Sequence, residues 1–162
     1  MKKSFCLFAA LVLVFLALPA GIVFADETIE IEDWHDLNNI RNNLDAVYAL
    51  ANDLDENTPG YDEHVEGGSW EPIKDFKGNF YGGGYEIKNL QMDTGDDKTG
   101  LFGSIDGAVI KNLGIVDSWI RGDDKTGSLV GYAENSRIEG CYVLNSFIDG
   151  SELTGGLVGK NY

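Results

Sequence analysis

The chain has 162 residues, of which 43% are hydrophobic, and its 27 acidic against 12 basic side chains give a net charge of −15. This excess of negative charge repels nucleic acids and anionic lipid surfaces, so we exclude nucleic-acid binding and expect solubility and association with cations.

Residues 1–25 have the pattern of a secretory signal peptide. Two lysines precede an uncharged, mostly apolar run over 5–24, and the run ends at the small residue Ala25 before Asp26. The alternative is an uncleaved anchor, since the run is nearly long enough to span a bilayer, but the small residue at its end favours cleavage. We therefore expect a secreted or cell-surface protein that contacts the membrane only through this peptide or through an anchor outside the sequence.

Cleavage after residue 25 leaves ten basic against 27 acidic side chains, a net charge of −17, in a chain long enough for one domain. Cys141 is then the single cysteine, which excludes an internal disulfide. It occupies the repeat position of Leu113, so we expect it to behave as a small buried apolar residue.

The segment 26–75 does not repeat, and we expect it to be a small α/β unit that caps the repeats after it. In chain order we first expect a strand over 28–31 and then a helix that starts at Asp33 or Asp36. Leu37, Ile40 and Leu44 would lie on one face of this helix. A strand over 46–50 and an acidic loop over 53–68, which contains Pro59-Gly60, should follow.

Residues 76–162 are repetitive. The string GDDKTG occurs over 95–100 and again over 122–127, and an aliphatic step before glycine recurs every 28 residues at 101–103, 129–131 and 157–159. These repeats are rich in Gly, Asn, Ile and Val and show no helical period. They predict an all-β solenoid with coils of about 28 residues that share one core.

The apolar columns of this solenoid follow from the repeat offset. Ile110, Leu113 and Ile115 should stack on Ile138, Cys141 and Val143. We place Ile87, Leu90 and Met92 in the same columns, which makes the first coil shorter than the others. The stretch 155–162 is only the opening of a further repeat, so we expect either the N-terminal part of a longer protein or an edge that pairs with another chain.

The stretch 155–161 resembles the GLUG motif, whose family form is close to G-G-L-V-G-x-N, and 127–131 and 100–103 are similar to weaker copies. The stretches over 48–55, 70–73 and 76–82 resemble what leads into such repeats. The resemblance implies a right-handed parallel β-helix. GLUG repeats occur in bacterial and archaeal surface proteins, in adhesin-like proteins and in some surface peptidases, where the repeats are not the catalytic part.

Acidic residues recur at one corner of successive coils and are candidate calcium ligands, because calcium prefers several oxygen ligands. The candidates are Asp96, Asp97, Asp123, Asp124 and Asp149. The alternative is that they are solvated turn residues with lysines beside them, and no stretch matches a calcium-loop pattern.

Trp119 and Phe147 lie one repeat apart and are the candidate binding residues. If alternation holds up to Ile120, both point outward as an aromatic ladder that could meet sugar rings or a protein partner. The alternative is that Asp117 and Asn145 mark a bend and that the aromatic rings pack under a neighbouring segment. Tyr61 and Trp70 are weaker candidates of the same kind.

The sequence contains no catalytic triad, zinc motif or phosphate-binding loop, and we expect His35 to be a surface residue. We therefore predict no enzymatic activity and no cofactor except calcium.

We predict an adhesin-like scaffold at the cell surface or outside the cell, whose ligand is a surface glycan or a protein. The alternatives are a non-catalytic accessory region of a secreted peptidase or polysaccharide-active enzyme, and a calcium-stabilised carbohydrate-binding module.

Overall fold

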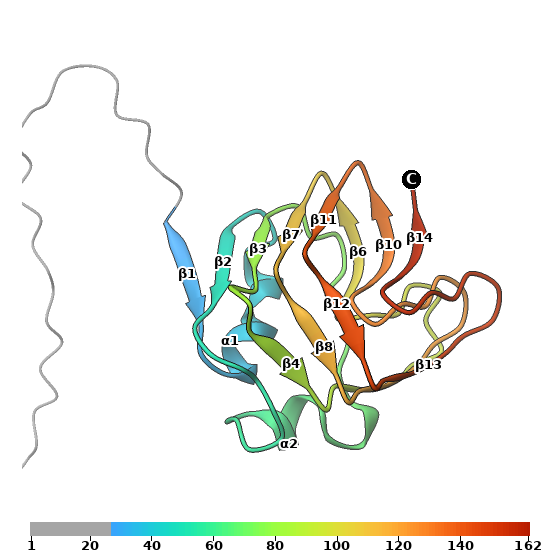
Figure 1. Cartoon of the computed structure of the whole chain (residues 1–162), viewed down its shortest axis with the longest axis horizontal. Coiled ribbons are helices and arrows are strands. Elements are labelled where there is room, and N and C mark those ends of the chain that lie inside the picture. The colour runs from blue at the N-terminus through green and yellow to red at the C-terminus, as the bar shows by residue number, and fades with distance from the viewer. Residues whose placement is uncertain (1–26) are drawn as a thin grey trace, which may run out of the picture.

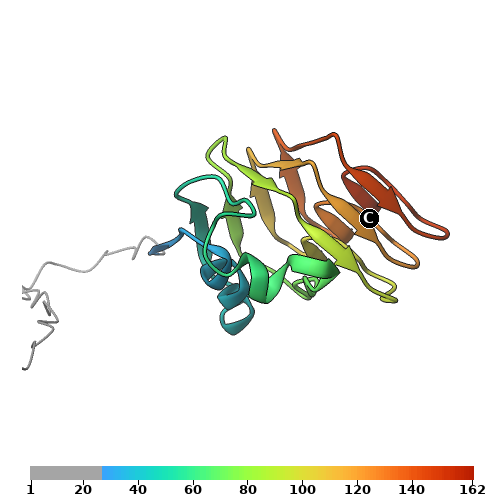
Figure 2. The same ribbon diagram turned by 90° about the horizontal axis from the view of Figure 1, so that it is seen from below.

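The structure, a computed structural model, describes residues 27–162, and the predicted signal peptide over 1–25 lies outside the described residues (Figure 1). The described chain winds into a solenoid whose strands stack in parallel sheets, which confirms the predicted fold class. Three regular coils cover 79–106, 109–134 and 137–161, here named the first, second and third coil. Figure 2 shows the helices gathered at the N-terminal end, with the coils following side by side.

Each coil contributes one strand to each of four sheets. The first coil contains β3 (Asn79–Tyr81), β4 (Glu86–Lys88), β5 (Gln91–Asp93) and β6 (Phe102–Asp106). The second contains β7 (Val109–Lys111), β8 (Gly114–Val116), β9 (Trp119–Arg121) and β10 (Val130–Glu134). The third contains β11 (Arg137–Glu139), β12 (Tyr142–Leu144), β13 (Phe147–Asp149) and β14 (Val158–Asn161). The stacks are β3-β7-β11, β4-β8-β12, β5-β9-β13 and β6-β10-β14.

The N-terminal segment extends the first of these stacks. β1 (Thr28–Ile31) pairs with β2 (Val47–Leu50), and β2 pairs with β3, so the two predicted strands are confirmed. Between them, helix α1 (Trp34–Asn39) begins at Asp33, whose side chain accepts a hydrogen bond of 2.9 Å from the backbone N–H of Asp36. The short 3-10 helix η1 (Ile40–Asn42) follows. Further along, Leu54, Ile73 and Phe76 pair with the first coil as an irregular turn of the solenoid.

The stretch 53–68, predicted as a loop, contains helix α2 (Tyr61–His64) and the 3-10 helix η2 (Glu66–Gly68). The turn at Gly60, with φ of 85°, starts α2, and burial of Tyr61 and Val65 holds it against the core. The rings of Tyr61 and Trp70 each meet the buried Trp34 edge-on, with centroids 5.8 Å apart. Tyr61 and Trp70 are therefore core residues, and their assignment as candidate binding residues was wrong.

The predicted register of the first coil was also wrong. Ile87 was predicted to pair with Ile110, but it pairs with Ile115. Ile110 pairs instead with Phe80 of the first coil. The corner between Phe80 and Ile87 is two residues longer than the corresponding corner of the second coil, because it contains Gly82-Gly83-Gly84. The predicted pairing of the second coil with the third, Ile110 with Ile138 and Ile115 with Val143, is confirmed.

Left-handed residues turn the chain between the second and third strands of each coil. Asn89, Asp117 and Asn145 have φ of 55°, 50° and 50°, a conformation that asparagine and aspartate tolerate better than most residues. The predicted bend is therefore present, but the side chains on either side of it keep their alternation.

The repeated GDDKTG string forms a corner that is solvated on one side only. Thr99 and Thr126 are fully buried and pair with each other, and each hydroxyl donates a hydrogen bond of 3.0 Å to the backbone carbonyl three residues earlier. A Cβ on Gly122 would lie 2.4 Å from the Thr99 hydroxyl. The buried threonine thus fixes the shape of the corner in both copies, Gly122 adds a close approach in the second copy only, and the acidic side chains face solvent.

The interior side chains of the first two coils are buried, whereas those of the third coil are partly exposed at the end of the solenoid. Interior residues of the third coil are only partly buried; these are Ile138, Cys141, Val143, Leu157 and Val158. Cys141 packs against the core with a free thiol, but it is only partly buried and not buried as predicted, and this partial burial raises the pKa of the thiol. Among residues 27–162 no helix has the length and apolar character needed to cross a bilayer.

Candidate binding surface

The stack of β5, β9 and β13 carries a pair of aromatic rings on its outer face. The rings of Trp119 and Phe147 are nearly parallel, with centroids 6.4 Å apart and an interplanar angle of 11°. Phe147 is 53% exposed and Trp119 is partly exposed. The outward orientation predicted from strand alternation is therefore present, and the alternative packing under a neighbouring segment is not.

The stacking follows from the register of the two strands. Trp119 pairs with Phe147 and Ile120 with Ile148, so equivalent side chains lie one strand spacing apart on the same face. Ile120 is fully buried, which fixes its neighbours Trp119 and Arg121 on the outside.

Charged groups lie beside the aromatic pair. The Arg121 guanidinium lies 5.3 Å from the centre of the Trp119 ring, and its Nε is 3.2 Å from Oδ2 of Asp149. A flat apolar ring next to hydrogen-bonding groups can stack on the apolar face of a sugar while its hydroxyls are bound at the side. We name these four residues, Trp119, Arg121, Phe147 and Asp149, the aromatic face.

The N-terminal segment closes one side of the aromatic face. Gln91 occupies the equivalent position in the first coil, and its side chain donates to the Tyr61 hydroxyl at 3.0 Å and accepts from the backbone N–H of Gly67 at 3.2 Å. The face therefore begins at Trp119 and extends toward the third coil.

Four of the five acidic calcium candidates lie at the GDDKTG corners, whereas Asp149 ends strand β13, and most of the five have other partners. Asp96 pairs with Lys74 at 2.8 Å, Asp124 with Lys125 at 3.5 Å, and Asp149 with Arg121. Asp123 accepts a hydrogen bond of 2.6 Å from the Ser151 hydroxyl, and Asp97 is exposed. Within the described part of the chain, none of the five belongs to a group of three His, Cys, Asp or Glu side chains whose ligand atoms lie within 4.8 Å of one another.

One such group does occur among the described residues, and no motif in the sequence predicts it. His35, Glu63 and His64 come together from α1 and α2. Since 29 residues separate the two histidines, no short motif joins them, and their convergence depends on the unpredicted helix α2.

Comparison with known proteins gives one partial similarity. A stretch of 86 residues, 52% of this chain, is 40% identical to part of a protein named Halomucin from Haloquadratum walsbyi. The chain spans 1% of the length of that relative, so the similarity concerns a small part of a far longer protein. No protein-family model matches the chain, and no solved structure matches it.

Proposed function

We propose that this chain is an exported segment of a cell-surface protein, in which the solenoid serves as a structural scaffold and the aromatic face binds surface glycans or proteins. The observation that carries the adhesive role is the exposed, parallel stack of Trp119 and Phe147 on a rigid sheet. Apolar side chains that are grouped on a protein surface mark interaction sites more often than apolar side chains exposed singly.

Three further observations support a surface location. The similar protein is named Halomucin, a name that marks it as a mucin. The chain begins with the pattern of a signal peptide, and its net charge of −15 suits an extracellular, solvent-exposed scaffold. A β-solenoid also suits a scaffold, because each coil contacts only its neighbours and coils can be added without changing the fold.

We also propose that the coils are repeats of the GLUG type and that this segment is the N-terminal part of a longer protein. The third coil leaves interior side chains such as Val143 and Val158 only partly buried. A further coil stacked on this face would bury them, as the second coil buries the first.

Sedimentation with purified cell envelopes of the source organism tests the adhesive role. The double variant Trp119→Ala/Phe147→Ala should bind the envelopes about tenfold more weakly, since one aromatic stacking contact is worth roughly 0.5–1.5 kcal/mol beyond its buried area. Tyr81→Ala removes an exposed aromatic from another stack, on β3, and should leave binding unchanged. Equal binding by the double variant and the parent would refute the assignment of the aromatic face.

A further inference from the structure

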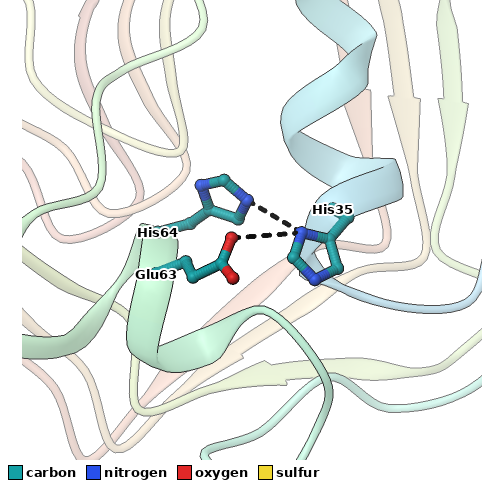
Figure 3. Close-up of side chains that lie close together, drawn as sticks. All are labelled: His35, Glu63 and His64. Carbon is teal, nitrogen blue, oxygen red and sulfur yellow. Dashed lines mark hydrogen bonds and ion pairs between the residues drawn. The ribbon is translucent and has the colours of Figure 1, made fainter.

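Two imidazoles and a carboxylate meet on the surface of the N-terminal segment (Figure 3). Nδ1 of His35 on α1 lies 3.1 Å from Nε2 of His64 and 3.8 Å from Oε2 of Glu63, both on α2. The side chain of His35 is 43% exposed and that of Glu63 is 67% exposed, so solvent and ions reach the group.

Buried contacts hold the two helices in this arrangement. The ring of Trp34, next to His35, is fully buried, and its indole N–H donates to the Asp55 carbonyl at 2.9 Å. The backbone N–H of Trp34 donates to the Pro59 carbonyl at 3.1 Å. On the other helix, the Tyr61 hydroxyl donates to the Asn89 carbonyl at 2.7 Å. The backbones that carry the three side chains are therefore fixed by the core.

The turn before α2 leaves room for the His35 ring. Gly60 adopts φ of +85°, and a Cβ at this position would lie 3.0 Å from Nε2 of His35. The imidazole thus packs against a bare backbone, which orients Nδ1 toward α2.

The separation of the two nitrogens matches that of two ligands on one metal ion. Zinc binds imidazole nitrogen at about 2.0–2.1 Å, so two nitrogens on a tetrahedral ion lie about 3.3 Å apart, and at a right angle about 2.9 Å apart. The observed 3.1 Å is the length of a hydrogen bond between the two rings, and it also falls between these two values. The Glu63 oxygen, 3.8 Å from Nδ1 of His35, lies about 0.5 Å farther from this nitrogen than a second ligand of a tetrahedral zinc ion would lie, and all three donor atoms lie within 4.8 Å of one another.

We propose that His35, Glu63 and His64 bind a divalent transition-metal ion of the zinc type and so link α1 to α2. Two imidazoles and one carboxylate suit zinc, copper, nickel or iron(II), whereas calcium prefers oxygen ligands alone. Three protein ligands leave at least one coordination position for water or for a donor group of a partner.

Titration of the full chain with zinc chloride, followed by calorimetry and by NMR of the imidazole rings, tests this site. The chain has two histidines, both in the cluster, so the ring signals report on this site alone. The titrated protein carries Cys6→Ser and Cys141→Ala, which removes both thiols as competing ligands. We expect one zinc per chain, shifts of both ring systems at one equivalent, and no displacement by a tenfold excess of calcium.

Variants of α2 provide the controls. His64→Ala and Glu63→Gln should each weaken zinc binding at least tenfold, since loss of even an outer-shell partner of a metal ligand costs about 10–100-fold. Asp62→Asn removes an adjacent exposed carboxylate outside the cluster and should bind zinc like the parent. Ring signals that do not move at about 1 mM zinc, displacement by calcium, or undiminished binding by folded His64→Ala would each overturn the proposal. If His64→Ala does not fold, the ring signals of the parent decide the question alone.

Discussion

The phenol of Tyr142 in the third coil lies across Gly114 of the second coil and donates a hydrogen bond to the carboxylate of Glu86 in the first. A Cβ on Gly114 would lie 2.6 Å from Cζ of Tyr142, so only glycine leaves the ring this path. One side chain therefore connects all three coils on the outer face of β4, β8 and β12.

A double-mutant cycle tests this connection. Gly114→Ala should displace the ring and lower the free energy of unfolding by about 0.5–1.5 kcal/mol, the usual net contribution of one hydrogen bond. In a Tyr142→Ala background the same change should cost nothing, because the ring is already absent. Urea unfolding of the four proteins gives the coupling free energy, and a value of zero would show that the ring does not depend on Gly114.

The carboxylates beside this ring should make stability depend on pH. Lys88 Nζ lies 2.8 Å from Asp53 Oδ2 and 3.0 Å from Glu86 Oε2. The hydrogen bond from Lys88 lowers the pKa of Asp53, and the hydrogen bond from Tyr142 lowers the pKa of Glu86. A carboxyl group whose pKa is lowered by folding stabilises the protein above its unfolded pKa, about 4, and this stabilisation is lost as the pH falls through the folded value.

We therefore expect the parent to be more stable than Asp53→Asn at pH 6 and the difference to shrink at pH 3. Comparing two proteins that share almost all other charges cancels the general effect of pH on repulsion between acidic groups. Urea unfolding at both pH values measures the difference, and an equal difference at pH 3 and pH 6 would contradict this role of Asp53.

Salt should stabilise the protein. With a net charge of −15, repulsion between carboxylates opposes the compact state, and ions screen exposed charges more strongly as their concentration rises. The midpoint of thermal unfolding should rise as sodium chloride increases from about 0.05 to 1 M, where the screening length falls to about 3 Å. A midpoint that falls with salt would indicate that the ion pairs outweigh the general repulsion.

Calcium should raise the midpoint of thermal unfolding no more than sodium does at the same ionic strength. Asp96, Asp124 and Asp149 already pair with basic side chains, so calcium chloride at matched ionic strength should give the same unfolding midpoint as sodium chloride. An additional rise at millimolar calcium would instead support a calcium site at the acidic corner, because a ligand bound only by the folded state stabilises it by mass action.

The buried threonine of the GDDKTG corner should matter more than its charges. Thr126→Val keeps the shape but leaves the Asp123 carbonyl without the hydroxyl that donates to it, so we expect a loss of about 1–3 kcal/mol. Thr126→Ser keeps the hydroxyl and should lose less, and Asp124→Asn on the solvated side should be nearly neutral. Thermal unfolding ranks the three variants; a neutral Thr126→Val would show that the hydroxyl does not hold the corner.

The sequence predicts those parts of the fold that depend on a strict repeat. Ile110 and Ile138 lie 28 residues apart and do pair, and alternation around Ile120 correctly turns Trp119 outward. Prediction fails where the chain departs from the repeat. Phe80 takes the place of an isoleucine, and three glycines lengthen the next corner, so matching isoleucine to isoleucine moves the first coil out of register.

The candidate metal site was unpredictable for a different reason. His35 and His64 stand on short helices whose packing depends on the buried ring of Trp34 and on the turn at Gly60. Neither helix carries a second histidine at ligand spacing. Only the three-dimensional contact between α1 and α2 brings the three side chains together.

The central claim is that the chain is displayed at the cell surface, and labelling of cells tests it most directly. An antibody raised against the folded solenoid is applied to intact and to permeabilised cells of the source organism. We expect intact cells to be labelled as strongly as permeabilised ones and to lose the label after external protease treatment. Labelling that requires permeabilisation would contradict the claim.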